Sequence, residues 1–110
     1  MSQQSNADLR RYYRVANRKY FKGKLPDIPV RFAKFDPGLL GITNVVTFKG
    51  KTVATSIEIT EDIRYIQTTT IMTLLHEMTH VEKPQYKGHG WQWERQMMRL
   101  ARAGAFGGLW

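Results

Sequence analysis

The sequence predicts one α+β domain, in which helices at both ends of the chain enclose a small three-stranded antiparallel sheet. The first observation is helical spacing of apolar residues in three segments, at residues 8–21, 68–81 and 90–103. The second is a set of short β-rich runs between residues 30 and 59. The third is size, because 110 residues are enough for one hydrophobic core. Hydrophobic residues make up 42% of the chain, which is ordinary for a globular protein and excludes extensive disorder.

The first helix is expected over residues 8–21. Its apolar face would carry Leu9, Tyr13, Ala16 and Tyr20, and Tyr12 would widen that face. Ser5 or Asn6 is suited to cap its start. Gly23 followed by Pro26 is typical of its end. The single domain is expected to span residues 1–110, with residues 1–6 and 104–110 loosely ordered.

Three strands are expected next, over residues 30–35, 41–48 and 52–59. A turn at Asp36-Pro37-Gly38 follows the first strand. The second and third strands are separated by Lys49-Gly50-Lys51, a loop length suited to a hairpin. Alternation of residue types in the third strand predicts one buried and one solvent-exposed face. Val53, Thr55, Ile57 and Ile59 lie on one face, opposite Ala54, Ser56 and Glu58.

The second helical segment covers residues 68–81 and should pack on the sheet through Ile71, Leu74, Leu75 and Met78. Residues 61–66 form either a separate turn or its first turns, and Pro84 ends it. The last helix is expected over residues 90–103. It should bury Trp93, Met97, Leu100 and Ala101.

Positive charge is concentrated near the N-terminus. The chain has 17 Lys and Arg against 9 Asp and Glu, a net charge of +8. Residues 1–24 contain a single acidic residue, Asp8, and a basic set that includes Arg10, Arg11, Arg14 and Arg18. Such a patch favours polyanions, with nucleic acid the leading candidate, and Tyr12 and Tyr13 could stack on bases. The alternative is a solvated helix face that serves solubility.

Composition also excludes several classes of protein. The chain has no cysteine, which excludes disulfides, thiolate nucleophiles and Cys-ligated zinc. No apolar run approaches the roughly 20 residues that span a bilayer, and the N-terminus lacks the apolar stretch of a secretory signal. We therefore expect a cytoplasmic protein with no membrane partner.

His76-Glu77-Met78-Thr79-His80 forms an H-E-x-x-H motif within the second helical segment. Residues four apart on a helix lie on the same face, so the two imidazoles can meet at one zinc ion, about 2.0–2.1 Å from each ring nitrogen. Glu77 can reach water at that metal without binding the metal itself. His89, in Gly88-His89-Gly90, is the remaining histidine. Three protein ligands are typical of a catalytic zinc.

Two plainer interpretations of the motif remain open. The histidines could be ordinary core or surface residues, with Glu77 in an ion pair on an exposed helix face. A structural zinc is the other interpretation. Such a site normally fills its fourth position with a side chain, and the chain offers no Cys or fourth His, although Asp or Glu could close it.

Two segments carry a specific resemblance to a known family. One is Thr73 to His80 and the other is Gly88-His89-Gly90 followed by Trp91 and Trp93. Weaker similarity covers Asn17 to Pro26, Val30-Arg31-Phe32 and Ile57-Glu58-Ile59. Together these segments resemble the SprT-like metalloprotease family, in a minimal single-domain form.

The resemblance implies a zincin-type core and one Zn²⁺ held by His76, His80 and His89, with Glu77 as the catalytic base. It also implies, for some relatives, proteolysis of proteins attached to DNA. The spacer between His80 and His89 is shorter than in several relatives. Relatives often carry further zinc-binding or DNA-binding modules after the core, and none fits after residue 103, so contact with DNA would fall to the first helix.

We therefore expect a zinc metalloendopeptidase that acts on DNA-bound or DNA-crosslinked proteins. The expected partners are a protein substrate and DNA held electrostatically without sequence preference, and a monomer is favoured. The main alternative is a zinc-stabilised nucleic-acid-binding module with little peptidase activity, which would have no need of Glu77. A third hypothesis is a peptidase that cleaves a specific regulator or peptidoglycan-like peptides, in which the positive charge serves only solubility.

No residue stands out as the group that stabilises the tetrahedral oxyanion. Tyr86 lies in the appropriate stretch of chain but is more in keeping with a structural role. Trp91 is expected to pack beside the third ligand. Thr79, between the two ligands of the helix, is expected on the helix surface.

Overall fold

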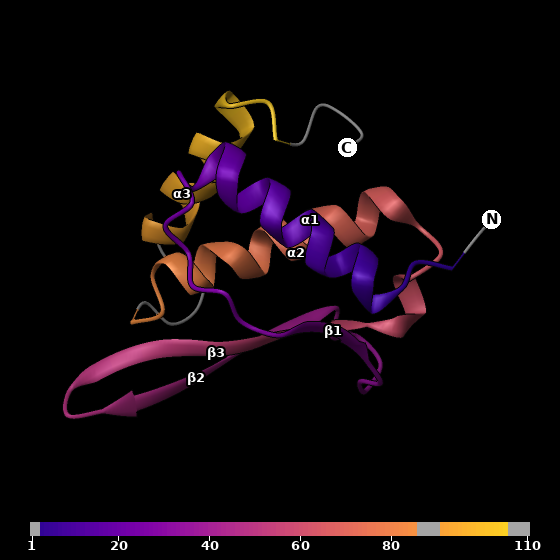
Figure 1. Ribbon diagram of the computed structural model, residues 1–110, viewed down its shortest axis with the longest axis horizontal. Coiled ribbons are helices and arrows are strands. Elements are labelled where there is room, and N and C mark those ends of the chain that lie inside the picture. The colour runs from indigo at the N-terminus through magenta and orange to yellow at the C-terminus, as the bar shows by residue number, and fades with distance from the viewer. Residues whose placement is uncertain (1–2, 86–90, 106–110) are drawn as a thin grey trace.

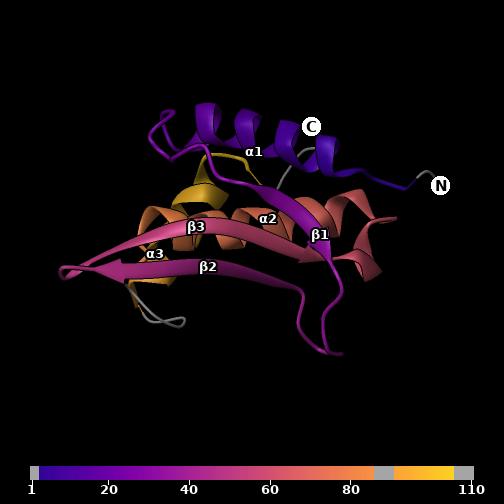
Figure 2. The same cartoon turned by 60° about the horizontal axis from the view of Figure 1, so that its bottom comes forward.

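The computed structural model describes residues 3–85 and 91–105, without the side chains of residues 91–94 and 96. Within these residues the chain forms three α-helices and a sheet, in the order α1 (Asn6–Tyr20), β1 (Val30–Ala33), β2 (Gly41–Phe48), β3 (Lys51–Thr60), α2 (Gln67–Glu82) and α3 (Trp91–Arg102), with a short 3₁₀ turn at Glu61–Ile63. The helices α1 and α2 lie on the same side of the sheet (Figures 1 and 2). The core between these layers confirms the α+β class.

The sheet has the order β1-β3-β2 and is mixed. β2 and β3 form the expected antiparallel hairpin, but β1 pairs in parallel with β3, with Val30 opposite Ile57. The prediction of an all-antiparallel sheet is therefore wrong. The reason is that β3, which carries the fully buried Ile57 and Ile59, occupies the centre of the sheet. It therefore lies between β1 and β2, and β1 does not pair with β2, the next strand in sequence.

A β-bulge changes which side chains of β3 face the core. Asn44 pairs with Ser56 and Val45 pairs with Ala54, so Thr55 is left as the extra residue. The alternation of faces shifts by one at that point, because successive side chains of a strand point to opposite faces. Ala54 is buried and Val53 is 42% exposed, which overturns the prediction that Val53 shares a face with Ile57.

The hairpin turn contains two residues, Lys49 and Gly50, rather than three. Both have positive φ, 52° and 78°, as a type I′ turn requires. The first strand also ends earlier than predicted, at Ala33.

A capping box begins α1. Ser5 Oγ accepts a hydrogen bond from the backbone N–H of Asp8 at 3.1 Å, and Asp8 Oδ2 accepts one from the N–H of Ser5 at 2.8 Å. Just before it, Gln4 Nε2 donates to the backbone oxygen of Arg64 and to Thr70 Oγ1, both at 3.0 Å. These contacts tie the start of the chain, part of which was expected to be loosely ordered, to the segment that leads into α2.

The buried face of α1 contains Leu9, Tyr12, Tyr13 and Ala16. The Tyr13 hydroxyl donates to the backbone oxygen of Pro26 at 2.6 Å. Burial, reinforced by the nearby charge of Asp27, raises the pKa of Tyr13 to about 12. The helix ends where Lys22 and Gly23 adopt positive φ, as the glycine predicted.

The predicted apolar face of α2 is confirmed, since Ile71, Leu74, Leu75 and Met78 are all buried. Residues 61–63 form the separate turn that was one of the two alternatives. In α3, Leu100 is fully buried and Met97 packs against the core, whereas Ala101 is exposed, contrary to the prediction. Within the described parts of the chain, every helix is too short or too polar to cross a membrane.

Candidate functional site

The helix α2 brings the two histidines of the motif together. The ring centroids of His76 and His80 are 5.2 Å apart, and the ring planes are tilted by 44°. Both side chains are half-buried. The spacing of four residues therefore has the predicted effect, which is to make the two imidazoles neighbours on one helix face.

The predicted third ligand, His89, lies outside the described residues, as does Tyr86. The side chains of Trp91 and Trp93 are likewise not described. Among residues 3–85 and the described part of 91–105, no group of three potential metal-ligating side chains occurs. The described side chains thus supply a pair of imidazoles.

Glu77 lies on the side of α2 that faces the sheet and is only 7% exposed. The hydroxyl group of Thr43, on β2, donates to Glu77 Oε1 over 2.8 Å and also lies 3.1 Å from the backbone oxygen of Glu77. Burial raises the pKa of the Glu77 carboxyl, and the hydrogen bond from Thr43 opposes that shift. The alternative of an exposed ion pair at Glu77 is therefore wrong, because this carboxyl is buried against β2.

Gly41, two residues before Thr43, allows β2 to approach this carboxyl closely. A Cβ atom at position 41 would lie 3.2 Å from both Cγ and Oε2 of Glu77 and 3.0 Å from Cγ2 of Thr73. A glycine within a strand often marks such an approach. Neither Gly41 nor Thr43 was predicted to belong to the site. The glycine within a strand is the one sequence feature that could have indicated a close approach of β2 to α2.

Thr79 lies between the two histidines in sequence but not on the helix surface. It is 3% exposed, and its hydroxyl donates to the backbone oxygen of His76 at 2.6 Å. The expectation of a surface position is wrong, because this side chain returns its hydroxyl to the preceding helical turn and is covered by the core.

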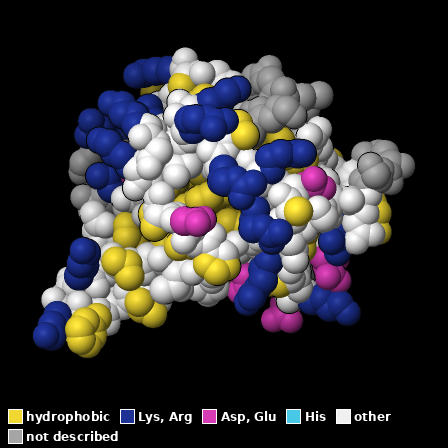
Figure 3. Space-filling model, in the orientation of Figure 1, with side chains coloured by type: hydrophobic (Ala, Val, Ile, Leu, Met, Phe, Trp, Pro, Cys, Tyr) yellow, Lys and Arg dark blue, Asp and Glu magenta, His cyan; other side chains and the backbone are white. Residues whose placement is uncertain are grey.

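The basic face of α1 is a second feature. Arg10, Arg11, Arg14 and Arg18 are all exposed, and Figure 3 shows Lys and Arg side chains gathered over this part of the molecule. Arg11 lies 3.5 Å from Asp8 in an ion pair. Tyr12 and Tyr13 are 4% and 3% exposed, so the proposal that they stack on bases is wrong.

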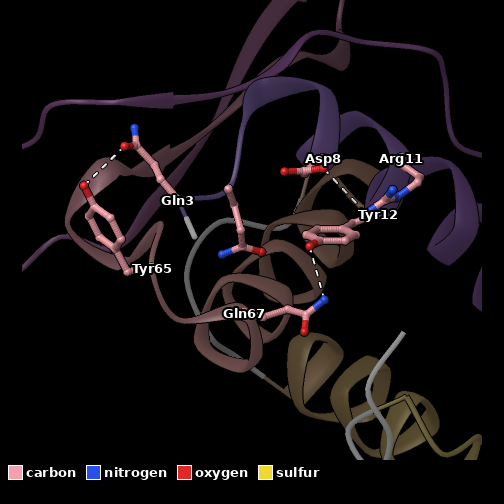
Figure 4. A pocket seen from close by; sticks show the side chains of 7 residues that line it. Gln3, Asp8, Arg11, Tyr12, Tyr65 and Gln67 are labelled. Carbon is pink, nitrogen blue, oxygen red and sulfur yellow. Dashed lines mark hydrogen bonds and ion pairs between the residues drawn. The ribbon is translucent and has the colours of Figure 1, made fainter. Parts of the chain in front are cut away.

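A polar pocket of about 480 Å³ lies at the N-terminal ends of α1 and α2 (Figure 4). Tyr12 takes part in its wall and accepts a hydrogen bond from Gln67 Nε2 at 3.2 Å. The other lining residues are Gln3, Gln4, Asp8, Arg11 and Tyr65. The pocket is separate from the histidine pair, since neither His76 nor His80 lines it.

Comparison with known families matches residues 9–107 to the model described as the SprT-like family. The match covers nearly the whole chain and includes the histidine pair and the carboxyl between them. Curated proteins and solved structures give no match.

Proposed function

The chain belongs to the SprT-like family, and we propose that it is a zinc-dependent metalloendopeptidase with a zincin-type core. The observation that carries the proposal is the arrangement on α2, where two imidazoles lie 5.2 Å apart and the residue that follows the first of them carries a buried carboxyl. Two neighbouring imidazoles are donors that suit zinc. A carboxyl between the two histidines in sequence has no purpose in a purely structural zinc site, which weighs against the alternative of a nucleic-acid-binding module with little peptidase activity.

The ion would be held by His76, His80 and His89. Zinc at these ligands would supply Lewis-acid chemistry, which polarises a peptide carbonyl and makes water more acidic. All further steps belong to the side chains of the chain itself.

Glu77 is the proposed general base. Thr43 occupies Oε1 of Glu77 and so holds the carboxyl in one orientation, which leaves Oε2 to accept a proton from the attacking water. The same oxygen would then donate that proton to the nitrogen of the leaving amine. Burial favours this role, because it raises the pKa of the carboxyl and a base works best when its pKa approaches the working pH.

The proposed substrates are proteins bound or crosslinked to DNA. The support for this part is the exposed basic face of α1, with Arg10, Arg11, Arg14 and Arg18. Several phosphate contacts would make affinity for DNA fall steeply with salt. DNA that stimulates cleavage would favour this proposal over a peptidase whose charge serves solubility.

Glu77→Gln is the decisive variant. It should retain zinc, measured by elemental analysis, and lose casein cleavage by about 10²–10⁴-fold. His89→Ala should lose or weaken the single equivalent of zinc expected in the wild-type protein. Cleavage at the wild-type rate by Glu77→Gln would contradict the mechanism, and unchanged zinc in His89→Ala would contradict the ligand set.

A further inference from the structure

The end of the β2–β3 hairpin is an exposed apolar surface that none of the proposed chemistry uses. The ribbon extends beyond the helices at one end of the molecule (Figure 1). Phe48 is 72% exposed, the highest value among the exposed large hydrophobic residues of the described chain, and Val46 and Val53 are 51% and 42% exposed. We call Val46, Phe48, Lys49, Lys51 and Val53 the hairpin tip.

The register places most of these side chains on one face. Phe48 lies opposite Lys51, and Val46 lies opposite Val53, and cross-strand partners share a face of the sheet. Ala54, the neighbour of Val53, is buried, so the shared face is the one turned away from the core. The bulge at Thr55 is what brings Val53 onto this exposed face.

The charged side chains that the hairpin itself places beside these apolar residues are lysines. Lys49 Nζ lies 5.5 Å from the centre of the Phe48 ring, and Lys51 is the cross-strand partner of Phe48. The sequence has no Asp or Glu between Asp36 and Glu58. Figure 3 shows the hydrophobic and basic side chains together at this end of the molecule.

We propose that the hairpin tip binds single-stranded nucleic acid, with a base stacked on Phe48 and phosphates held by Lys49 and Lys51. An aromatic ring flanked by cations matches a ligand in which flat bases alternate with anionic groups. The inference extends the DNA half of the proposed function to a second surface and does not depend on the peptidase half.

Charge argues against a second copy of the chain as the occupant. Two hairpin tips packed face to face would bring four lysines together on chains that each carry +8, and like charges in contact disfavour association. A lipid surface fits less well, because one phenyl ring and two half-exposed valines form a small anchor, and even one acyl chain binds membranes only marginally.

The test is titration of a short fluorescein-labelled oligothymidine, followed by fluorescence anisotropy at several salt concentrations. Phe48→Ala should weaken binding by about tenfold, because stacking on an aromatic side chain contributes this order of affinity per base, and it should leave the salt dependence unchanged. Tyr65→Ala is the matched control, since Tyr65 is a 49% exposed aromatic residue at another site, and it should bind as the wild type does.

The lysines give an independent readout. The double variant Lys49→Gln/Lys51→Gln should lower the slope of log affinity against log salt by about 1.4, which is about 0.7 for each phosphate contact on a single strand. Lys49→Arg/Lys51→Arg retains the charges and should keep the wild-type slope. Circular dichroism checks that each variant is folded.

Several outcomes would overturn the inference. One is equal affinity of the wild type and Phe48→Ala. Another is capture of the wild type, but not Phe48→Ala, by phosphatidylserine vesicles without any effect on oligothymidine binding. A third is a dimer in sedimentation that Phe48→Ala converts to a monomer. Casein cleavage reports separately on the peptidase proposal, so a chain that binds through the hairpin tip but cleaves nothing would contradict that proposal alone.

Discussion

Replacing Thr43 with valine removes one hydroxyl group from the contact between β2 and α2 and leaves the side-chain size nearly unchanged. That hydroxyl is 2.8 Å from Oε1 of Glu77, and Glu77 is only 7% exposed. Water cannot readily replace the lost donor at so buried an oxygen. The carboxyl therefore loses its hydrogen-bond partner, and its pKa should rise further, because the hydrogen bond from Thr43 opposes the upward shift that burial causes.

The size of the effect follows from the type of hydrogen bond. A hydrogen bond to a charged group contributes about 1.5–3 kcal/mol to stability. We expect the free energy of unfolding of Thr43→Val to fall by about this amount at neutral pH. Turnover should fall by about ten- to a hundredfold if Glu77 is the general base, because the carboxyl is no longer held in one orientation.

Urea unfolding and casein cleavage measure the two effects. Thr43→Ser is the matched control, since it keeps the hydroxyl and loses only a methyl group, and it should restore both stability and turnover to near the wild-type values. Equal urea midpoints for the valine and serine variants would refute the reasoning. A fall in stability with unchanged turnover would limit Thr43 to a structural role.

Two further predictions concern packing and pH. Gly41→Ala should lower the free energy of unfolding by about 1–3 kcal/mol, since its Cβ would lie 3.2 Å from Glu77 atoms; an unchanged urea midpoint would mean that β2 and α2 can separate freely. Tyr13, with a pKa of about 12 in the folded chain against 10.0 in the reference state, makes stability fall as pH rises, because the unfolded chain loses that proton first. The expected loss is about 2–3 kcal/mol between pH 10 and 12, and urea unfolding of Tyr13→Phe should show a flatter alkaline limb than the wild type.

The parts of the fold that depend on local pattern could be predicted from the sequence. The helix α1 follows from the spacing of Leu9, Tyr13 and Ala16, and the Ser5 cap follows from its residue type. The order of the strands could not be predicted, because nothing in β1 itself shows whether it will pair with β2 or with β3. The bulge at Thr55 was missed for the same reason, since it is a property of the pair of strands.

The candidate site likewise contains residues that the sequence predicts and residues that it does not. His76, Glu77 and His80 lie within one helix, so their spacing alone predicts that the two rings become neighbours. Thr43 and Gly41 reach Glu77 from a strand that is distant in sequence, and no local pattern connects them. The spacing in α1 also places Tyr13 on the apolar face and Tyr12 beside it, so their burial could be predicted, and the suggestion that they stack on bases conflicted with that spacing.

The parallel pairing of β1 with β3 has a consequence for the order in which the chain acquires its structure. The hairpin needs only a two-residue turn and can close within microseconds. Pairing of Val30 with Ile57 instead requires closure of a much longer loop between β1 and β3. On the ribosome, β1 emerges well before the strand that it will join. Until then the N-terminal third of the nascent polypeptide has no sheet to pack on, and the tyrosines of its helix stay exposed to solvent.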